Sequence, residues 1–201
     1  MIAIILIVVY ILLVKGESIK RLSRKPIKSI LFIGDSNTVA SYSYADKLKN
    51  MFPGLSIKKI AQVGEKTDWM YKQLIDELNK SSYDLVAILG GSNDIYALNS
   101  IDSAKENLNN MYRFAKSKGS QVLAITPPNK DFYVNKTDQK QVLLDSLNDW
   151  IKNNPNKDYF VDFHKITDDK SFFSSADGYL HANSNAHDIL ANQTKQVLNL
   201  A

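Results

Sequence analysis

The sequence predicts an α/β domain in which helices cover both faces of a parallel β-sheet. Five short runs rich in apolar, β-branched or aromatic residues alternate with longer amphipathic segments, and turn residues bound the runs. Because strand and helix alternate along the chain, successive strands are expected to be parallel, with right-handed crossovers that place helices on both faces. The five expected strands are residues 29–33, 56–61, 85–89, 121–126 and 159–162.

The amphipathic segments between and after these strands are the expected helices. In the second of them, Met70, Leu74 and Leu78 recur at the spacing of one helix face. Gly119 is the expected C-cap of the third helix, and Pro155 lies just past the end of the fourth. The five expected helices lie near residues 39–51, 68–80, 101–118, 138–153 and 184–199.

Charge is concentrated near the N-terminus. Residues 15–28 hold six lysines and arginines against Glu17, whereas the whole chain has a net charge of only +4. Residues 29–201 therefore sum to about −1, and no basic face indicates nucleic-acid binding. The chain has no cysteine, which excludes a disulfide framework and a thiolate metal site.

The first fourteen residues form an uncharged, apolar segment, Met1–Val14. As a helix they would span about 21 Å, against about 30 Å for the hydrocarbon core of a bilayer. No positive region precedes the segment, which disfavours a signal peptide. We interpret residues 1–14 as a short membrane anchor, 15–28 as a basic linker and 29–201 as the folded domain. A buried or swapped apolar helix is the alternative.

The side of the membrane stays open at this point, as does the oligomeric state. The positive-inside rule places the basic flank, and the domain after it, in the cytoplasm. The opposite placement, with the domain outside the cytoplasm, is the alternative. The sequence alone does not choose between the two.

The tetrapeptide Gly34-Asp35-Ser36-Asn37 ends the first expected strand. Its position places the Ser36 hydroxyl at the carboxyl edge of the sheet, where open α/β folds bind ligands. A serine hydroxyl is a weak nucleophile and needs a neighbouring base to take its proton. Catalysis by Ser36 would therefore require a base nearby and donors that stabilise an oxyanion.

Three histidines are available as the base. His181 follows Asp177 by four residues, so the carboxylate can bind one ring nitrogen and leave the other for the serine. The alternative interpretation is a surface histidine next to a capping aspartate. His187 is the competing base, and His164, after the fifth strand, is interpreted as a loop histidine.

Three groups are candidates for an oxyanion hole, which must present fixed donors to a developing negative charge. They are the backbone N–H of Ser36, the backbone at Gly64 and the side-chain amide of Asn93. Gly64 lacks a side chain, which lets backbone approach a ligand. Taken singly, Gly64 is also compatible with a plain turn and Asn93 with an Asx turn. Asp35 and Asp94 are interpreted as turn and scaffold residues.

With these blocks the chain resembles the SGNH hydrolase superfamily, also called GDSL esterases and lipases. Gly34-Asp35-Ser36-Asn37 matches the first block, with Asn37 where leucine often stands, and Gly91-x-Asn93-Asp94 matches the third. The second block retains Gly64, but Gln62 replaces its usual asparagine. In the last block the family has aspartate three residues before histidine, whereas Asp177 precedes His181 by four.

The resemblance covers residues 29–199 and implies a fold and a site. The fold is a three-layer α/β/α domain with a five-stranded parallel sheet of flavodoxin-like order. In the site, Ser36 is the nucleophile, His181 the base and Asp177 its orienting acid, while Ser36, Gly64 and Asn93 form the oxyanion hole. The changed spacing leaves two versions open, a triad restored by a one-residue bulge and a dyad without Asp177.

The expected function is that of a membrane-tethered serine esterase that removes small acyl groups, acetyl above all, from a carbohydrate or lipid. The chain is short and has no long insertion for a lid, which favours small acyl groups on an accessible substrate. The alternatives are a lysophospholipase or thioesterase, or a carbohydrate- or lipid-binding module with weak catalysis. No cofactor or metal is expected, since Gly90-Gly91 lacks the Lys-Ser/Thr of a phosphate-binding loop.

Overall fold

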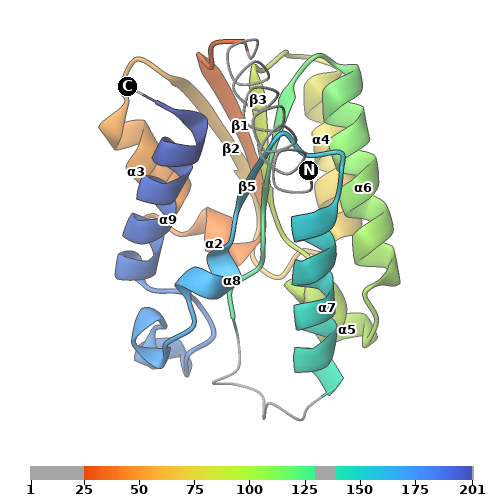
Figure 1. Ribbon diagram of the computed structural model, residues 1–201, viewed down its shortest axis with the longest axis vertical. Coiled ribbons are helices and arrows are strands. Elements are labelled where there is room, and N and C mark those ends of the chain that lie inside the picture. Colours follow the sequence, from red (N-terminus) through yellow and green to blue (C-terminus); the bar gives the residue numbers. More distant parts are fainter. Residues whose placement is uncertain (1–24, 130–138, 201) are drawn as a thin grey trace, which may run out of the picture.

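A computed structural model describes residues 25–129 and 139–200. Five parallel strands form one sheet in the order β2-β1-β3-β4-β5 (Figure 1). This sheet, with helices on both faces, confirms the expected fold class. The strands are β1 (Ser29–Gly34), β2 (Ser56–Ala61), β3 (Leu85–Leu89), β4 (Gln121–Ile125) and β5 (Tyr159–Val161).

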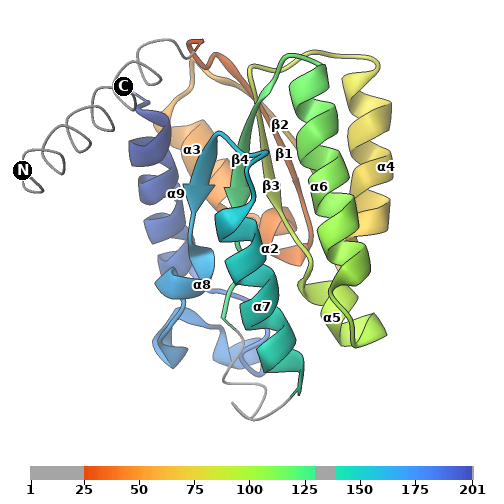
Figure 2. The same cartoon turned by 45° about the vertical axis from the view of Figure 1, so that its right-hand side comes forward.

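Helices α3 (Tyr44–Met51) and α9 (Ser184–Leu198) cover one face of the sheet, as Figure 2 shows. The opposite face is covered by α4 (Thr67–Leu78), α6 (Asp102–Ser117) and α7 (Gln139–Asn153). Short helices stand at the carboxyl ends of the strands, at the lower end of Figure 1. They are α2 (Ser36–Val39), α5 (Ser92–Leu98), α8 (Phe163–Ile166) and the 3₁₀ turns Lys170–Phe172 and Ser175–Asp177.

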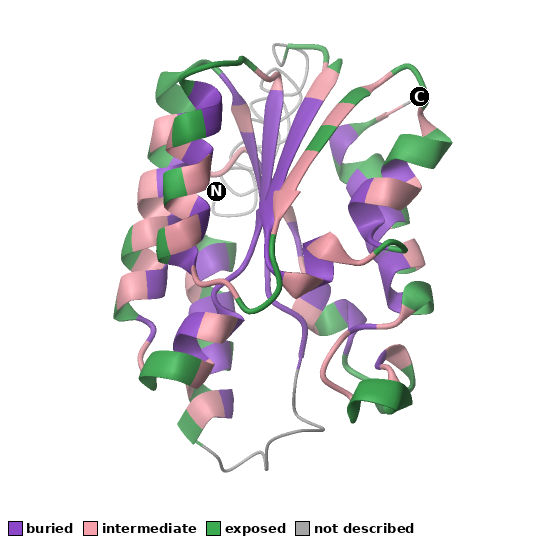
Figure 3. Ribbon diagram, turned by 180° about the vertical axis from the view of Figure 1, so that it is seen from behind, coloured by how far each residue is buried: buried purple, intermediate pink, exposed green. Residues whose placement is uncertain are grey.

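The central strands are buried on both faces, which is why they read as continuous apolar runs. In β1, Ile30 and Phe32 belong to the core under α3 and α9, whereas Leu31 and Ile33 belong to the core under α4 and α6. The edge strand β2 is more exposed (Figure 3). The sheet therefore separates two cores and gives the site a rigid base.

The expected helix at 39–51 is wrong in its first half. The chain forms the short helix α2, turns, and starts α3 at Tyr44. Asp35 caps α2 through the backbone N–H of Asn37, and Ser43 caps α3 through that of Asp46. Helix caps are formed by polar side chains, so the spacing of apolar residues does not reveal them. The segment therefore looks like one continuous helix when only its apolar residues are compared.

The remaining helices differ from the prediction at one helix end and in two short helices. The C-cap of α6 is Lys118 and not the expected Gly119, which is the next residue and has the left-handed φ of +84° typical of a glycine just past a helix. Helices α5 and α8 were not expected, since a four- to seven-residue helix has too few turns to show periodicity. His164 consequently lies on α8 and not in a loop.

The predicted membrane anchor, residues 1–14, and most of the linker lie outside the described residues. Within the part of the chain that the structure describes, no helix has the length and apolarity needed to cross a bilayer. The last linker residues are attached to the sheet, since the backbone N–H groups of Lys28 and Ser29 both donate to Asp84 Oδ2 at 2.9 Å.

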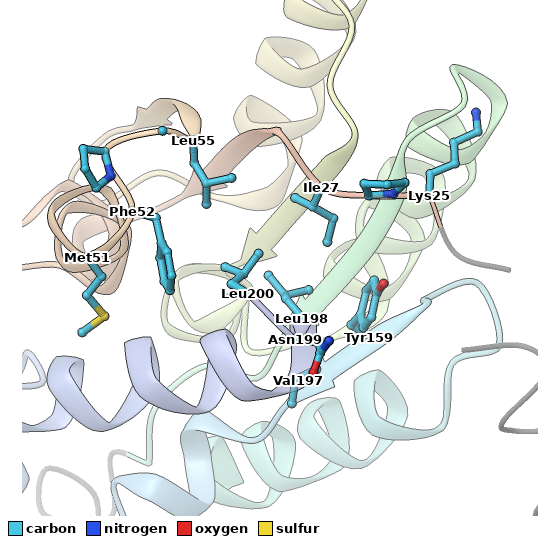
Figure 4. A pocket seen from close by; sticks show the side chains of 13 residues that line it. Lys25, Ile27, Met51, Phe52, Leu55, Tyr159, Val197, Leu198, Asn199 and Leu200 are labelled. Carbon is cyan, nitrogen blue, oxygen red and sulfur yellow. The ribbon is translucent and has the colours of Figure 1, made fainter. Parts of the chain in front are cut away.

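A cavity of about 570 Å³ lies at the amino-terminal end of the sheet, between the last turns of α3 and α9 (Figure 4). It is bordered by the chain before β1 and β2 and by the start of β5. None of the predicted site residues lines it. Its side chains include Ile27, Phe52, Leu55, Tyr159, Leu198 and Leu200.

Candidate active site

The carboxyl ends of three neighbouring strands bring the first three sequence blocks together. Ser36 follows β1, Gly64 follows β2 and Asn93 follows β3, and β1 lies between the other two strands. Gly34 at the end of β1 pairs with Ala61 of β2 and Leu89 of β3. Segments distant in sequence therefore meet at one edge of the sheet, as the parallel topology requires.

Gly34 and Asp35 explain how Ser36 is presented. A Cβ on Gly34 would lie 2.0 Å from Thr38 Oγ1, so glycine lets α2 fold directly onto the end of the strand. The Asp35 carboxylate accepts a hydrogen bond of 2.9 Å from the backbone N–H of Asn37 and caps α2. Ser36 is then the first residue of the helix, half-buried, with its backbone N–H among those that no intrahelical bond uses.

The four-residue spacing between Asp177 and His181 still lets the two side chains meet. Asp177 Oδ2 lies 2.7 Å from His181 Nδ1, and Asp177 Oδ1 accepts a bond of 3.0 Å from the backbone N–H of Leu180. The chain turns between them through two residues with positive φ, Gly178 (70°) and Tyr179 (69°). This left-handed pair takes up the additional residue.

A tyrosine with positive φ is uncommon and must be held in place by its surroundings. The ammonium group of Lys170 lies 3.9 Å from the centre of the Tyr179 ring, a cation–π contact. The backbone N–H of Tyr179 donates to the carbonyl of Ser174 at 2.7 Å, and that of Ser174 donates to the carbonyl of His181 at 2.9 Å. These bonds close the loop that carries the histidine.

The electrostatics of Asp177 favour its ionised form. Desolvation raises the pKa of the carboxyl, but the hydrogen bonds from His181 and from the Leu180 N–H outweigh it and hold the pKa below its ordinary value. A carboxylate at Nδ1 selects the imidazole tautomer that carries its proton there. Nε2 of His181 is then the nitrogen available to accept a proton.

Ser36 and His181 line the same small cavity, which has a volume of about 160 Å³. Asp177, Gly64 and Asn93 are not part of its lining. The walls come from α2, from the loops after α2 and β2, and from the start of α9. Its lining residues are Ser36, Asn37, Val39, Ala40, Tyr42, Val63, His181, Ala182 and His187.

Gly64 and Asn93 are connected through the loop between β2 and α4. Asn93 Nδ2 donates to the backbone carbonyl of Glu65 at 2.8 Å, which uses one of its two amide protons. Gly64 is exposed and has φ +76°, but a Cβ there would have nothing within 4 Å. Glycine is thus required by the left-handed backbone and not by the close approach of another group.

Asp94 has a structural partner. Its carboxylate accepts bonds from Thr67, at 3.1 Å from the backbone N–H and 2.7 Å from Oγ1. Burial raises the pKa of Asp94, and the two Thr67 bonds oppose this rise. The contacts join the start of α4 to α5, as expected of a scaffold residue.

His187, the competing base, lies in the wall of the cavity but in the wrong tautomer for that role. The backbone N–H of Tyr44 donates to His187 Nδ1 at 3.3 Å, so in the neutral ring Nε2 carries the proton. The ring is completely buried and lies against Tyr42, Tyr44 and Phe163, with centroid distances of 5.6, 6.2 and 5.4 Å. Burial lowers the pKa of His187 to about 4.

His164 lies outside this cavity. Its Nε2 is 3.4 Å from Asp145 Oδ1, and it lines a separate cavity of about 180 Å³ formed by α7 and the ends of β4 and β5. Most of the loop 127–136, which follows β4, lies outside the described residues. Its first part is fixed, since the backbone N–H of Asn129 donates to Thr167 Oγ1 at 2.8 Å.

Sequence reasoning missed the apolar walls of the cavity. Tyr42 and Val63 are large side chains that remain 38% and 65% exposed, although both border a site. The signal available in the sequence was weak: Tyr42 lies in a short loop after the block that contains Ser36, and Val63 lies next to Gly64 in the second block. Such loop residues become interpretable only when the topology shows that their loops are neighbours.

The fold is that of an α/β/α serine hydrolase, and Ser36 and His181 line one cavity beside the carboxyl ends of its strands. The sequence model of the GDSL-like Lipase/Acylhydrolase family matches residues 32–189, and the chain belongs to this family. It is therefore a serine hydrolase of the ester-hydrolysing type. No curated protein sequence matches the chain.

Solved structures share the fold at low sequence identity. A catalytic mutant of Axe2, an acetylxylan esterase from Geobacillus stearothermophilus, is 18% identical with a TM-score of 0.72, covering 89% of this chain and 97% of its own. A member of the lipolytic protein G-D-S-L family from Veillonella parvula is 15% identical with a TM-score of 0.73, and the match covers 86% of this chain and 99% of that protein. The psychrotrophic esterase EstA from Pseudoalteromonas sp. is 14% identical with a TM-score of 0.67, and the match covers 86% of this chain and 97% of that protein.

Proposed function

We propose that this protein hydrolyses small acyl esters, acetyl esters above all, of a carbohydrate or lipid, with carbohydrate the first candidate. The observation that carries the proposal is the cavity that Ser36 and His181 share, with Asp177 bound to the far side of the imidazole at 2.7 Å. Similarity to an acetylxylan esterase supports the choice of an acetylated carbohydrate.

In the proposed acylation, Ser36 Oγ attacks the carbonyl carbon of the ester while His181 Nε2 takes the hydroxyl proton. The imidazolium that forms is stabilised by the Asp177 carboxylate at Nδ1. The tetrahedral intermediate collapses when the C–O bond to the alcohol breaks and His181 returns the proton to that oxygen. The alcohol leaves, and the acyl group stays on Ser36.

The negative charge of the intermediate needs donors that already point to it. The backbone N–H of Ser36 lies at the start of α2, where the helix leaves its first N–H groups unbound. Asn93 retains one amide proton after its bond to Glu65, and that bond places the amide beside the Gly64 loop. We assign these two donors and the Gly64 N–H to the oxyanion hole.

The size of the cavity favours a short acyl group. Its volume of about 160 Å³ is well below the roughly 300–1,000 Å³ of pockets that enclose drug-sized ligands. Val39, Ala40 and Val63 provide apolar contacts for a methyl or similarly short group. The alcohol part of the substrate would remain outside, which is compatible with a large carbohydrate.

Membrane attachment remains a proposal from the sequence alone. It depends on Met1–Val14, whose lack of charge is the supporting observation. Sedimentation of the full chain with vesicles, compared with fragment 25–201, tests it. Equal recovery of both proteins in the supernatant would contradict an anchor.

Release of acetate from acetylated xylo-oligosaccharides by the wild type and by Ser36→Ala tests the activity. We expect Ser36→Ala to lose hydrolysis, and a fluorophosphonate to label Ser36 in the wild type but not in His181→Ala. Turnover by Ser36→Ala at the wild-type rate would refute the assignment of the nucleophile. Preference for octanoyl over acetyl nitrophenyl ester would refute the short acyl group.

A further inference from the structure

The cavity at the amino-terminal end of the sheet takes no part in the proposed reaction. Its volume is about 570 Å³, and most of the side chains around it are apolar (Figure 4). Two of them, Met51 after the last turn of α3 begins and Val197 on α9, remain 40% and 36% exposed. A cavity of this size with exposed apolar walls is typical of a site that binds an apolar ligand.

The chain enters the described structure beside this cavity. Lys25, the first described residue, is part of the cavity lining. Its carbonyl accepts a bond of 3.0 Å from Gln121 Nε2 at the start of β4, so the chain is held against the sheet at this point. The linker residues 15–24, which join the proposed anchor Met1–Val14 to Lys25, can span at most about 36 Å. An anchored chain therefore keeps this end of the domain close to the bilayer.

Lysines gather around the cavity, whereas none of the described residues that line it is acidic. Lys25 lines it directly, and the ammonium group of Lys195 lies 5.5 Å from the centre of the Phe52 ring in its wall. Because the helices run antiparallel to the strands, lysines in their last turns collect at this end of the sheet. Such lysines are Lys49 of α3, Lys116 of α6, Lys152 of α7 and Lys195 of α9.

Two carboxylates at the same end of the sheet already have partners. Asp84 accepts the backbone N–H groups of Lys28 and Ser29, and Asp158 forms an ion pair with Lys116 at 2.9 Å. The helix dipole favours a lysine in a last turn, but it does not account for exposed apolar side chains next to it. Positive charge beside exposed apolar surface matches the chemistry of an anionic lipid, whose phosphate attracts ammonium groups and whose acyl chain is apolar.

We propose that this end of the domain docks on an anionic bilayer. An acyl chain of one phospholipid enters the cavity, and Lys25 and Lys195 contact lipid phosphates. The docking surface consists of Lys25, Met51, Phe52, Lys195 and Val197. This contact goes beyond the esterase activity and rests on the proposed membrane attachment. Stable attachment takes two signals, and the docking surface supplies the second one beside the anchor.

The docked orientation places the active site on the side away from the bilayer. Ser36 follows the carboxyl end of β1, whereas the cavity lies at the opposite end of the sheet. The six residues of β1 at about 3.3 Å each separate the two ends by about 20 Å. An ester within the bilayer surface is then out of reach of Ser36, but an acetylated carbohydrate that extends from the surface is not. Docking therefore favours carbohydrate over membrane lipid as the substrate.

Single cysteines can report the contact, because the chain has no cysteine of its own. Val197→Cys carries a nitrobenzoxadiazole fluorophore at the docking surface. Ile189→Cys is the matched control, since it lies on the same helix and is also 36% exposed, but eight positions, about 12 Å, nearer the active-site end. Each labelled full-length chain is mixed with vesicles of phosphatidylglycerol and phosphatidylcholine that carry a doxyl quencher on their acyl chains. Thermal unfolding of each variant checks its fold.

We expect the acyl-chain quencher to lower the emission at position 197 about twofold or more and to leave that at position 189 unchanged. A charge variant provides a second measurement. Lys25→Gln with Lys195→Gln should lower the partition coefficient of the full chain about tenfold, since each lysine at an anionic surface contributes about fivefold and salt screens part of it.

Lys105→Gln with Lys165→Gln is the control for net charge. It removes the same charge from the start of α6 and from α8, at the active-site end of the sheet. These lysines lie further from the docked bilayer than the Debye length of about 10 Å, so the partition coefficient should change by less than about twofold. Equal losses in the two double variants would overturn the docking surface.

Four fluorescence and sedimentation results would also overturn it. One is equal quenching at positions 197 and 189, and another is quenching at neither position in protein that sediments with the vesicles. Blue-shifted emission at position 197 without vesicles would assign the cavity to residues 1–14 of the same chain, or to a second copy if the shift grows with protein concentration. Recovery of the full chain in the supernatant would refute the membrane attachment and the docking together. Ester hydrolysis by the same preparation would show that the proposed activity still stands.

Discussion

Removal of the Asp177 carboxylate tests whether the changed spacing still yields a triad. Asp177→Ala deletes the 2.7 Å bond to His181 Nδ1, whereas Asp177→Asn keeps an oxygen for the Leu180 N–H. An asparagine that donates its amide to Nδ1 would force the imidazole proton onto Nε2, where it blocks proton transfer from Ser36. We therefore expect Asp177→Asn to lose at least as much activity as Asp177→Ala.

The magnitude follows from the solvent exposure of the pair. A hydrogen bond to a charged group contributes about 1.5–3 kcal/mol. The side chains of Asp177 and His181 are 33% and 26% exposed, so water screens part of their interaction. The loss should remain below the roughly 10⁴-fold effect at a buried catalytic aspartate. We expect kcat/KM of Asp177→Ala to fall about tenfold to a hundredfold.

Initial rates with nitrophenyl acetate, measured from pH 5 to 9, provide the assay. Asp188→Asn is the matched control, because it removes the same charge from α9 at the ion pair with Lys47, 2.6 Å away. A loss under about tenfold in both Asp177 variants would refute the triad and leave His181 to act in a dyad. A similar loss in Asp188→Asn would assign the effect to net charge.

Three further predictions concern the edge of the sheet and the second histidine. Asn93→Ala should lower kcat about 10²–10³-fold, because it removes a proposed oxyanion donor. Asn107→Ala, which removes a bond to Thr67, is the control and should leave kcat unchanged. Equal losses in the two variants would make Asn93 a scaffold residue. Gly34→Ala should lower the free energy of unfolding by about 1–3 kcal/mol, because the added Cβ would overlap the Thr38 side chain. An unchanged midpoint of urea denaturation would contradict the close packing of α2 against the end of β1. Between pH 6.5 and about 4 the unfolded state binds a proton at His187 that the folded state does not, so stability should fall with falling pH in that window, by an amount on the order of 3 kcal/mol. His187→Gln should flatten this dependence, and an equal slope in both proteins would assign it to other groups.

The strands and the position of Ser36 were predictable because their signals are local. A strand buried on both faces needs an unbroken apolar run, and a run such as 85–89 has few other interpretations. The position of Ser36 is predictable for a related reason, because Gly34 and Asp35 are the residues that a sharp turn from strand to helix requires. The break between α2 and α3 was not predicted, since it depends on the Ser43 cap within a segment whose apolar residues are spaced as in one helix.

By itself, the sequence determined that an α/β sheet presents Ser36 at its carboxyl edge, with Asp177 and His181 on a loop before the last helix. Only the tertiary structure decided which of these groups contact one another. The reach of Asp177 depends on two left-handed residues, one of them a tyrosine beside Lys170. The tautomer of His187 depends on a backbone N–H at Tyr44, 143 positions away in the chain. Contacts of this kind follow from packing between distant segments, which leaves no periodic trace in the sequence.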